Sequence, residues 1–262
     1  MDQMIRKQII EKLYETEQAH NVKIPLAIES GSRGWGFASP DSDYDCRFIY
    51  VPTKAHYLSV QKRRDVIEYD VDVVFDINGW CLKKAIQHII KSNAVMLEWL
   101  SCQEVYFCNP VVVSKLLKLA KTFFNPIHVT HHYLALAKKK LAEIESNEVG
   151  KLKTYFYVLR PLANMRYIEK FKAMSPMAYE QTLTAIDISD EVRREIERLL
   201  VVKKSALESE LMARNEVLVT YFRHEIDVYT AYVQKIKFEP VHHLDVADEV
   251  FREILELMWE NG

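Results

Sequence analysis

The spacing of apolar and polar residues changes along the chain, which predicts strands and helices in its first part and helices in the remainder. Residues 4–19 have the three-and-four spacing of an amphipathic helix, and the apolar run 24–28 predicts a strand that ends in a tight loop. The segments DYDCRFIYV (43–51) and RDVIEYDVDVVFDI (64–77) are two further strand candidates, and the second alternates between acidic and apolar residues.

From residue 78 onward the apolar positions recur at three and four, so a helix is expected to open at NGW and most of the remaining chain is expected to be helical. The pattern therefore predicts an α+β protein. We expect a mixed domain at residues 1–105 and a helical domain at residues 106–262.

The composition is that of a globular protein and does not indicate a particular binding partner. The 262 residues are 49% hydrophobic, enough to fill a core, and 35 basic against 37 acidic residues give a formal net charge of −2. This balance neither demands nor excludes a polyanionic partner. No run of about 20 apolar residues and no signal-peptide pattern is present, so a cytoplasmic location and no membrane contact are expected.

Three of the six glycines, Gly31, Gly34 and Gly36, lie within six positions at the end of the first predicted strand. Glycine permits a positive φ and a close approach of the backbone to a ligand. Ser32 adds a hydroxyl and Arg33 a fixed positive charge, a combination that suits a phosphate group. The alternative is a loop without a ligand.

An aspartate pair follows the glycines. In a strand Asp43, Asp45 and Arg47 share one face, so two carboxylates stand side by side and repel each other unless a cation lies between them. Mg²⁺ prefers oxygen ligands and commonly takes one or two carboxylates together with substrate phosphates. The alternative interpretation of DSDYD is a solvated turn whose acids cap backbone groups.

A third carboxylate would complete a two-metal site for nucleotidyl transfer. The third predicted strand offers four candidates on one face, and the alternation alone does not choose among them. These candidates are Glu68, Asp70, Asp72 and Asp76.

With these residues the chain resembles a known superfamily: GS at 31–32 followed by DSDYD is similar to the signature of DNA polymerase β-like nucleotidyltransferases. Three blocks resemble a bacterial and phage family of predicted nucleotidyltransferases linked to RNA repair, over roughly residues 25–170. The blocks are ESGSRGWGFASPDSDYDCRFIYV, DINGWCLKKAIQHIIKSNAVMLEWLS and LKTYFYVLRPLANMRYIE.

The resemblance implies a polymerase β-like palm of mixed sheet and helices in the N-terminal catalytic domain, two Mg²⁺ ions and a nucleoside triphosphate such as ATP. It places the third carboxylate just before GW, at Asp76, with Asp72 in reserve. The expected metal-binding and catalytic residues are Asp43, Asp45 and Asp76. The expected nucleotide-binding residues are Gly31, Ser32, Arg33, Arg47, Lys153 and Arg160.

Lys153, Tyr157 and Arg160 recur at four and three and share a helical face that is expected to contact the triphosphate. The alternative is a solvated basic face with aromatic packing.

The expected activity is transfer of a nucleoside monophosphate from the triphosphate to a hydroxyl. The acceptor is an RNA end, a protein hydroxyl or a small molecule, and the family association favours RNA. Two alternatives are a nucleotide-binding regulator without turnover and an antitoxin-like partner protein. The sequence does not determine the oligomeric state.

Overall fold

The computed structural model describes residues 2–69, 75–237 and 244–259, and contacts within the chain divide it into two compact units. The first unit contains residues 1–34, 43–124 and 240–262, and the second contains residues 35–42 and 125–239. The functional division expected at residues 1–105 and 106–262 stays a prediction, and the compact units group the chain differently.

The first unit contains a five-stranded mixed sheet in the order β3-β4-β2-β1-β5. β1 pairs antiparallel with β2 and β5, whereas β2 pairs parallel with β4. This mixed sheet with its helices confirms the predicted α+β class. The strands are β1 (Val22–Glu29), β2 (Tyr44–Pro52), β3 (Val66–Glu68), β4 (Phe75–Cys81) and β5 (Val105–Cys108).

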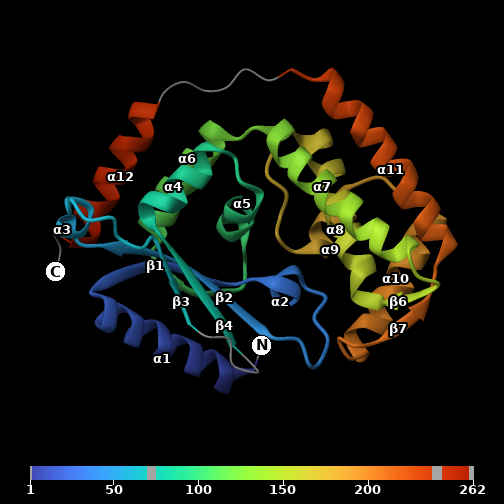
Figure 1. Cartoon of the computed structure of the whole chain (residues 1–262), viewed down its shortest axis with the longest axis horizontal. Coiled ribbons are helices and arrows are strands. Elements are labelled where there is room, and N and C mark those ends of the chain that lie inside the picture. Colours follow the sequence, from blue (N-terminus) through green and yellow to red (C-terminus); the bar gives the residue numbers. More distant parts are fainter. Residues whose placement is uncertain (1, 70–74, 238–243, 260–262) are drawn as a thin grey trace. The chain divides into compact units, whose positions relative to one another are not determined.

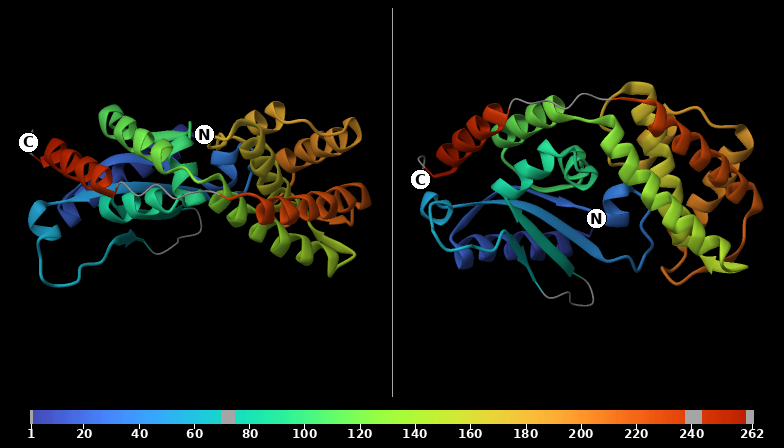
Figure 2. Two further views of the ribbon diagram at one scale, coloured as in Figure 1. Left: turned by 90° about the horizontal axis from the view of Figure 1, so that it is seen from above. Right: turned by 45° about the horizontal axis from the view of Figure 1, so that its top comes forward.

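Helices cover both faces of this sheet. α1 packs against β1 and β5, while α4 packs against β2 and β4 on the other face (Figure 1 and Figure 2). The last described helix, α12, packs on α4 and α6. The helices of this unit are α1 (Gln3–His20), α2 (Gly31–Trp35, whose last residue belongs to the second unit), α3 (Lys54–Tyr57), α4 (Leu82–Ile90), α5 (Ala94–Ser101), α6 (Pro110–Phe123) and α12 (Leu244–Trp259).

Strand β2 shows the two-sided character predicted for it. Tyr44, Cys46 and Phe48 are buried in the core beneath α1, whereas Asp45 and Arg47 are partly exposed. Because successive side chains of a strand point to opposite faces, burying one set leaves the other set on the opposite face of the sheet. The expected alternation is confirmed.

The expected strand 64–77 and the expected helix start at NGW were wrong in their bounds. β3 and β4 are two antiparallel strands, and residues 70–74, with Asp70 and Asp72, lie outside the described residues. β4 continues through Gly79 to Cys81, because a glycine leaves space for the ring of Phe48 on the neighbouring strand. A Cβ on Gly79 would lie 2.2 Å from that ring. Helix α4 therefore begins at Leu82.

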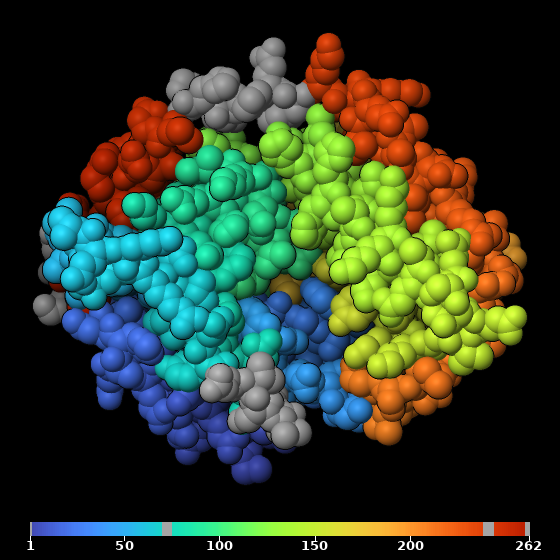
Figure 3. All heavy atoms as spheres, in the orientation of Figure 1, coloured from blue at the N-terminus to red at the C-terminus, as the bar shows by residue number. Residues whose placement is uncertain are grey.

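The second unit is mainly helical, as predicted, with one addition. Two three-residue strands, β6 and β7, pair antiparallel and were too short to be found from the hydrophobic pattern. α7 packs along α8 and α11, and Figure 3 shows α7, in yellow-green, at the surface. The elements are α7 (Pro126–Glu145), β6 (Val149–Lys151), α8 (Leu152–Phe171), α9 (Tyr179–Ala185), α10 (Asp190–Ser205), β7 (Leu211–Ala213) and α11 (Glu216–Lys235).

Among the helices described in either unit, none combines the length and the apolar character that crossing a membrane requires.

The segment 35–42, which leads into the aspartate signature, packs within the second unit through aromatic rings. Phe37 is 3% exposed and its ring stacks on Phe156 at a centroid distance of 5.0 Å. The ring of Tyr179 lies edge-on to the ring of Phe37, at a centroid distance of 5.8 Å. Burial of large aromatic side chains attaches this short segment to helices that are more than 100 residues away in sequence.

A buried ion pair holds the same segment. Lys203 is 1% exposed, and its Nζ donates to Ser39 Oγ at 2.6 Å and to Glu208 Oε1 at 2.8 Å. Ser42 Oγ donates to the same Glu208 oxygen at 2.6 Å. Burial raises the pKa of Glu208, but hydrogen bonds from Lys203, Ser42 and Lys153 outweigh this and lower it to about 2.

This lowered pKa predicts an acid-sensitive contribution to stability. The carboxylate stabilises the fold above the unfolded-state pKa near 4.5, and this stabilisation is lost as the pH falls from there towards 2. Between pH 4.5 and 3, the free energy of unfolding should depend less steeply on pH in Glu208→Gln than in the unmodified protein. The expected difference in slope is about 1 kcal/mol per pH unit. Denaturant unfolding at a series of pH values measures the slope, and identical slopes in both proteins would contradict the assignment.

Candidate active site

The parallel pairing of β2 with β4 brings two of the three predicted metal ligands together. In the register of this pair Asp45 lies directly opposite Asp76. Both side chains are partly exposed, 26% for Asp45 and 34% for Asp76. The sheet therefore presents two neighbouring carboxylates from segments 31 positions apart in the chain.

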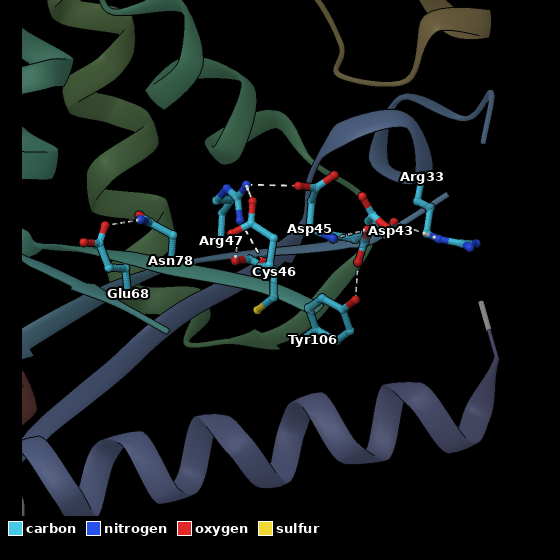
Figure 4. Close-up of polar contacts among 10 residues, drawn as sticks. Arg33, Asp43, Asp45, Cys46, Arg47, Glu68, Asn78 and Tyr106 are labelled. Atoms are coloured by element: carbon cyan, nitrogen blue, oxygen red, sulfur yellow. Dashed lines mark hydrogen bonds and ion pairs between the residues drawn. The ribbon is translucent and has the colours of Figure 1, made fainter. Parts of the chain in front are cut away.

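Arg47 lies between these two carboxylates. Its Nη2 donates to Asp45 Oδ1 at 3.0 Å (Figure 4). The same Nη2 donates to Asp76 Oδ2 at 2.6 Å, and Nη1 donates to the Asp76 carbonyl at 2.8 Å. The guanidinium thus offsets the repulsion between Asp45 and Asp76, whereas the metal ion between Asp43 and Asp45 that the sequence predicts stays a prediction. The predicted contact of Arg47 with a nucleotide also stays a prediction.

This arrangement of charges disfavours the charged form of Asp45. Burial raises the pKa of its carboxyl above the usual value, Arg47 opposes the rise, and Asp76 and Asp43 add to it. A raised pKa means that the charged form is disfavoured by its surroundings. A further positive charge near Asp45 would therefore be stabilised.

Asp43 is exposed one residue before β2, and its backbone carbonyl accepts a hydrogen bond from Arg33 Nε at 3.1 Å. The Arg33 guanidinium also lies 3.9 Å from the centroid of the Tyr44 ring. Within the described residues, no three acidic, histidine or cysteine side chains converge as a metal-binding group. The adjacent carboxylates of Asp45 and Asp76 nevertheless offer the oxygen donors that a hard divalent cation prefers.

Gly31 explains why glycine is needed at the start of the signature. Its φ is +57°, and a Cβ at this position would lie 1.9 Å from Asp45 Oδ2. The segment that was expected to be a loop forms the five-residue helix α2, in which Ser32 and Arg33 follow Gly31. The missing side chain makes room for the carboxylate of Asp45, in addition to any ligand that the backbone approaches.

Glu29 is a residue of this site that the sequence analysis missed. It is fully buried at the end of β1; its Oε1 accepts the backbone N–H of Asp45 at 2.9 Å, and Oε2 accepts the hydroxyl of Tyr106. Burial raises its pKa to about 7, although these hydrogen bonds lower it. Its place as an acid at the end of the apolar run IPLAI was the available signal.

Lys153 and Arg160 belong to the second unit, on α8. Lys153 Nζ pairs with Glu208 Oε2 at 3.2 Å. Arg160 is 5% exposed, and its guanidinium lies 3.9 Å from the centroid of the Trp35 ring, as in cation–π packing. Their contact with a triphosphate stays a prediction, and the burial of Arg160 gives it a packing role in this conformation.

Most of the chain matches the model of one protein family. The family model described as RNA repair pathway DNA polymerase beta family, RlaP, matches residues 5–253. The chain belongs to this family. The uncharacterized protein YcgL of Bacillus subtilis (strain 168) is 36% identical over 258 residues, which cover 98% of this chain and 99% of that protein. A crystal structure of a nucleotidyltransferase-like protein from Exiguobacterium sibiricum 255-15 is 13% identical, with a TM-score of 0.37 over 97% of this chain and 88% of that chain.

Membership of the RlaP family identifies the chain as a polymerase β-like nucleotidyltransferase. Enzymes of this kind generally use a nucleoside triphosphate and a divalent metal. The RlaP match confirms the family resemblance that the glycine and aspartate motifs indicated.

The close approach of Gly31 to Asp45 predicts that Gly31→Ala lowers activity strongly. The new Cβ would push the Asp45 carboxylate aside, and a displacement of about 1 Å costs roughly 100-fold in rate. Gly36→Ala is the matched control, because Gly36 has a φ of +88° but no heavy atom within 4 Å of its would-be Cβ. Initial rates of nucleotidyl transfer and thermal unfolding measure the two effects. Equal loss of activity in both variants would show that backbone strain alone is responsible.

Proposed function

We propose that this enzyme is a magnesium-dependent nucleotidyltransferase that moves a nucleoside monophosphate from a nucleoside triphosphate to the hydroxyl of an RNA end. The observation that carries the proposal is the pair formed by Asp45 and Asp76 across β2 and β4, with Asp43 two positions before Asp45. Carboxylates in such a pair suit divalent metal and phosphate chemistry. The family description supports RNA as the acceptor.

In this proposal Asp43, Asp45 and Asp76 would hold the metal ions. Bound Mg²⁺ would stabilise negative charge on the reacting phosphate oxygens. Asp76 would also accept the proton of the acceptor hydroxyl, as a carboxylate within reach of that group can. The acceptor oxygen then forms a bond to the α-phosphorus, and the bond from the α-phosphorus to the pyrophosphate oxygen breaks.

The nucleotide would be held by residues that surround the aspartates in the sequence. The backbone of Gly31, the hydroxyl of Ser32 and the guanidinium of Arg33 would contact the triphosphate. Arg47 would exchange part of its contact with Asp45 and Asp76 for a phosphate oxygen once metal neutralises the carboxylates. Lys153 and Arg160 are proposed as further contacts from α8.

Transfer of radiolabel tests this proposal and its alternatives. The protein is incubated with Mg²⁺ and each triphosphate labelled at the α-phosphate, in separate samples that contain RNA, protein or small hydroxyl compounds. Label that enters RNA, and is absent with Asp43→Asn/Asp45→Asn, is the expected result. Label that enters protein or a small hydroxyl compound instead would identify that compound, and not RNA, as the acceptor. Nucleotide binding without any transfer would favour a regulator or an antitoxin-like protein, and absence of nucleotide binding would overturn the proposal.

The position of Arg47 predicts how metal affects stability. In Arg47→Met the carboxylates of Asp45 and Asp76 lose their shared cation, so the melting temperature without metal should fall by roughly 5 °C. Added Mg²⁺ should raise it more in this variant than in the unmodified protein. Arg64→Met is the control, because Arg64 pairs with the exposed Glu68 instead. Equal metal-induced shifts in all three proteins would contradict a metal site at this pair.

A further inference from the structure

A cationic cavity lies within the second unit, away from the residues of the aspartate signature in sequence. Its volume is about 350 Å³, which falls in the range of pockets that hold small ligands. The end of α7, the strands β6 and β7, and the first turns of α8 form its walls. Residues 31–33 and the three aspartates do not line it, whereas Lys153, one of the proposed nucleotide contacts, does.

The charged groups of the cavity favour an anionic ligand. Three lysines line it against a single glutamate, Glu143. Lys140 Nζ donates to Glu143 Oε2 at 2.7 Å, and Lys153 pairs with Glu208. Lys151 is exposed at the N-cap of α8, and its side chain makes no hydrogen bond or ion pair with any part of the chain that the structure describes. Lys140 and Lys153 each pair with a glutamate, so the positive charge that remains at the cavity is that of Lys151.

The cavity also offers a ring and neutral polar groups. Tyr157 lines it, and the Nζ of Lys140 lies 5.6 Å from the centroid of that ring. Thr154 and Asn147 add hydrogen-bonding groups to the wall. Lysines beside an aromatic ring are the combination by which proteins bind single-stranded nucleic acid, since the cations contact phosphates and the ring stacks on a base.

We propose that this cavity binds the RNA acceptor strand, with Lys140 and Lys151 at backbone phosphates and Tyr157 against a base. The lysines come from α7, from the residue before α8 and from the first turn of α8, so they suit an extended anion rather than a single phosphate. The inference rests on the proposed RNA acceptor, but it concerns binding and not transfer.

Binding of a fluorescent single-stranded oligoribonucleotide tests the proposal without nucleotide or metal, so its outcome does not depend on catalysis. We expect Lys140→Ala/Lys151→Ala to weaken binding about tenfold and to reduce the salt slope of log K by about 1.4. Lys138→Ala/Lys139→Ala removes the same charge from exposed positions of α7 that do not line the cavity. That control should bind within about twofold of the unmodified protein.

A second measurement determines whether the cavity binds the phosphates of RNA or those of the nucleoside triphosphate. Binding of a non-hydrolysable triphosphate analogue with Mg²⁺ should be unchanged in Lys140→Ala/Lys151→Ala. Loss of analogue binding with RNA binding retained would assign the cavity to the triphosphate and overturn the proposal. It is equally overturned if both double variants weaken RNA binding alike, or if the unmodified protein binds no RNA. Label transfer can fail while the predicted RNA-binding difference persists, which distinguishes this inference from the proposed activity.

Discussion

The parallel pairing of β2 with β4 is the constraint on which the site depends, because it sets two carboxylates opposite each other on one sheet. Asp45 and Asp76 repel across this pair, and the fold tolerates them because Arg47 contacts both. The raised pKa of Asp45 shows that the compensation is incomplete. The surroundings of Asp45 thus favour an added cation, which is the electrostatic property that the metal site we propose requires.

The backbone around Asp45 is built to accommodate this carboxylate. Gly31 leaves the space that its Oδ2 occupies, and Glu29 accepts its backbone N–H from within the core. Glu29 is in turn held by the hydroxyl of Tyr106 on β5. Support from two neighbouring elements restricts the position of the Asp45 carboxylate, and for the catalytic role that we propose such restriction lowers the cost of reaching a reactive geometry.

The segment before the signature links this site to the second unit through the chain itself. Residues 35–42 are packed by Phe37 and by the buried Lys203 with its partner Glu208, whereas Asp43 begins the approach to β2 in the first unit. Ser42, the residue next to Asp43, donates to Glu208. The second unit therefore fixes the residues that directly precede Asp43 in the chain, in addition to the nucleic-acid contacts that we infer for its cationic cavity.

Local periodicity determined much of this protein without a structure. The period of two placed Asp45 and Arg47 on one face of β2, and the motifs indicated the nucleotidyltransferase family. Only the tertiary structure decided which groups meet: that Arg47 bridges two carboxylates, that Glu29 lies beneath Asp45, and that the 64–77 pattern contains two separate strands. The difference has a physical cause. Periodicity records which side of an element is buried, but register and pairing depend on residues distant in sequence.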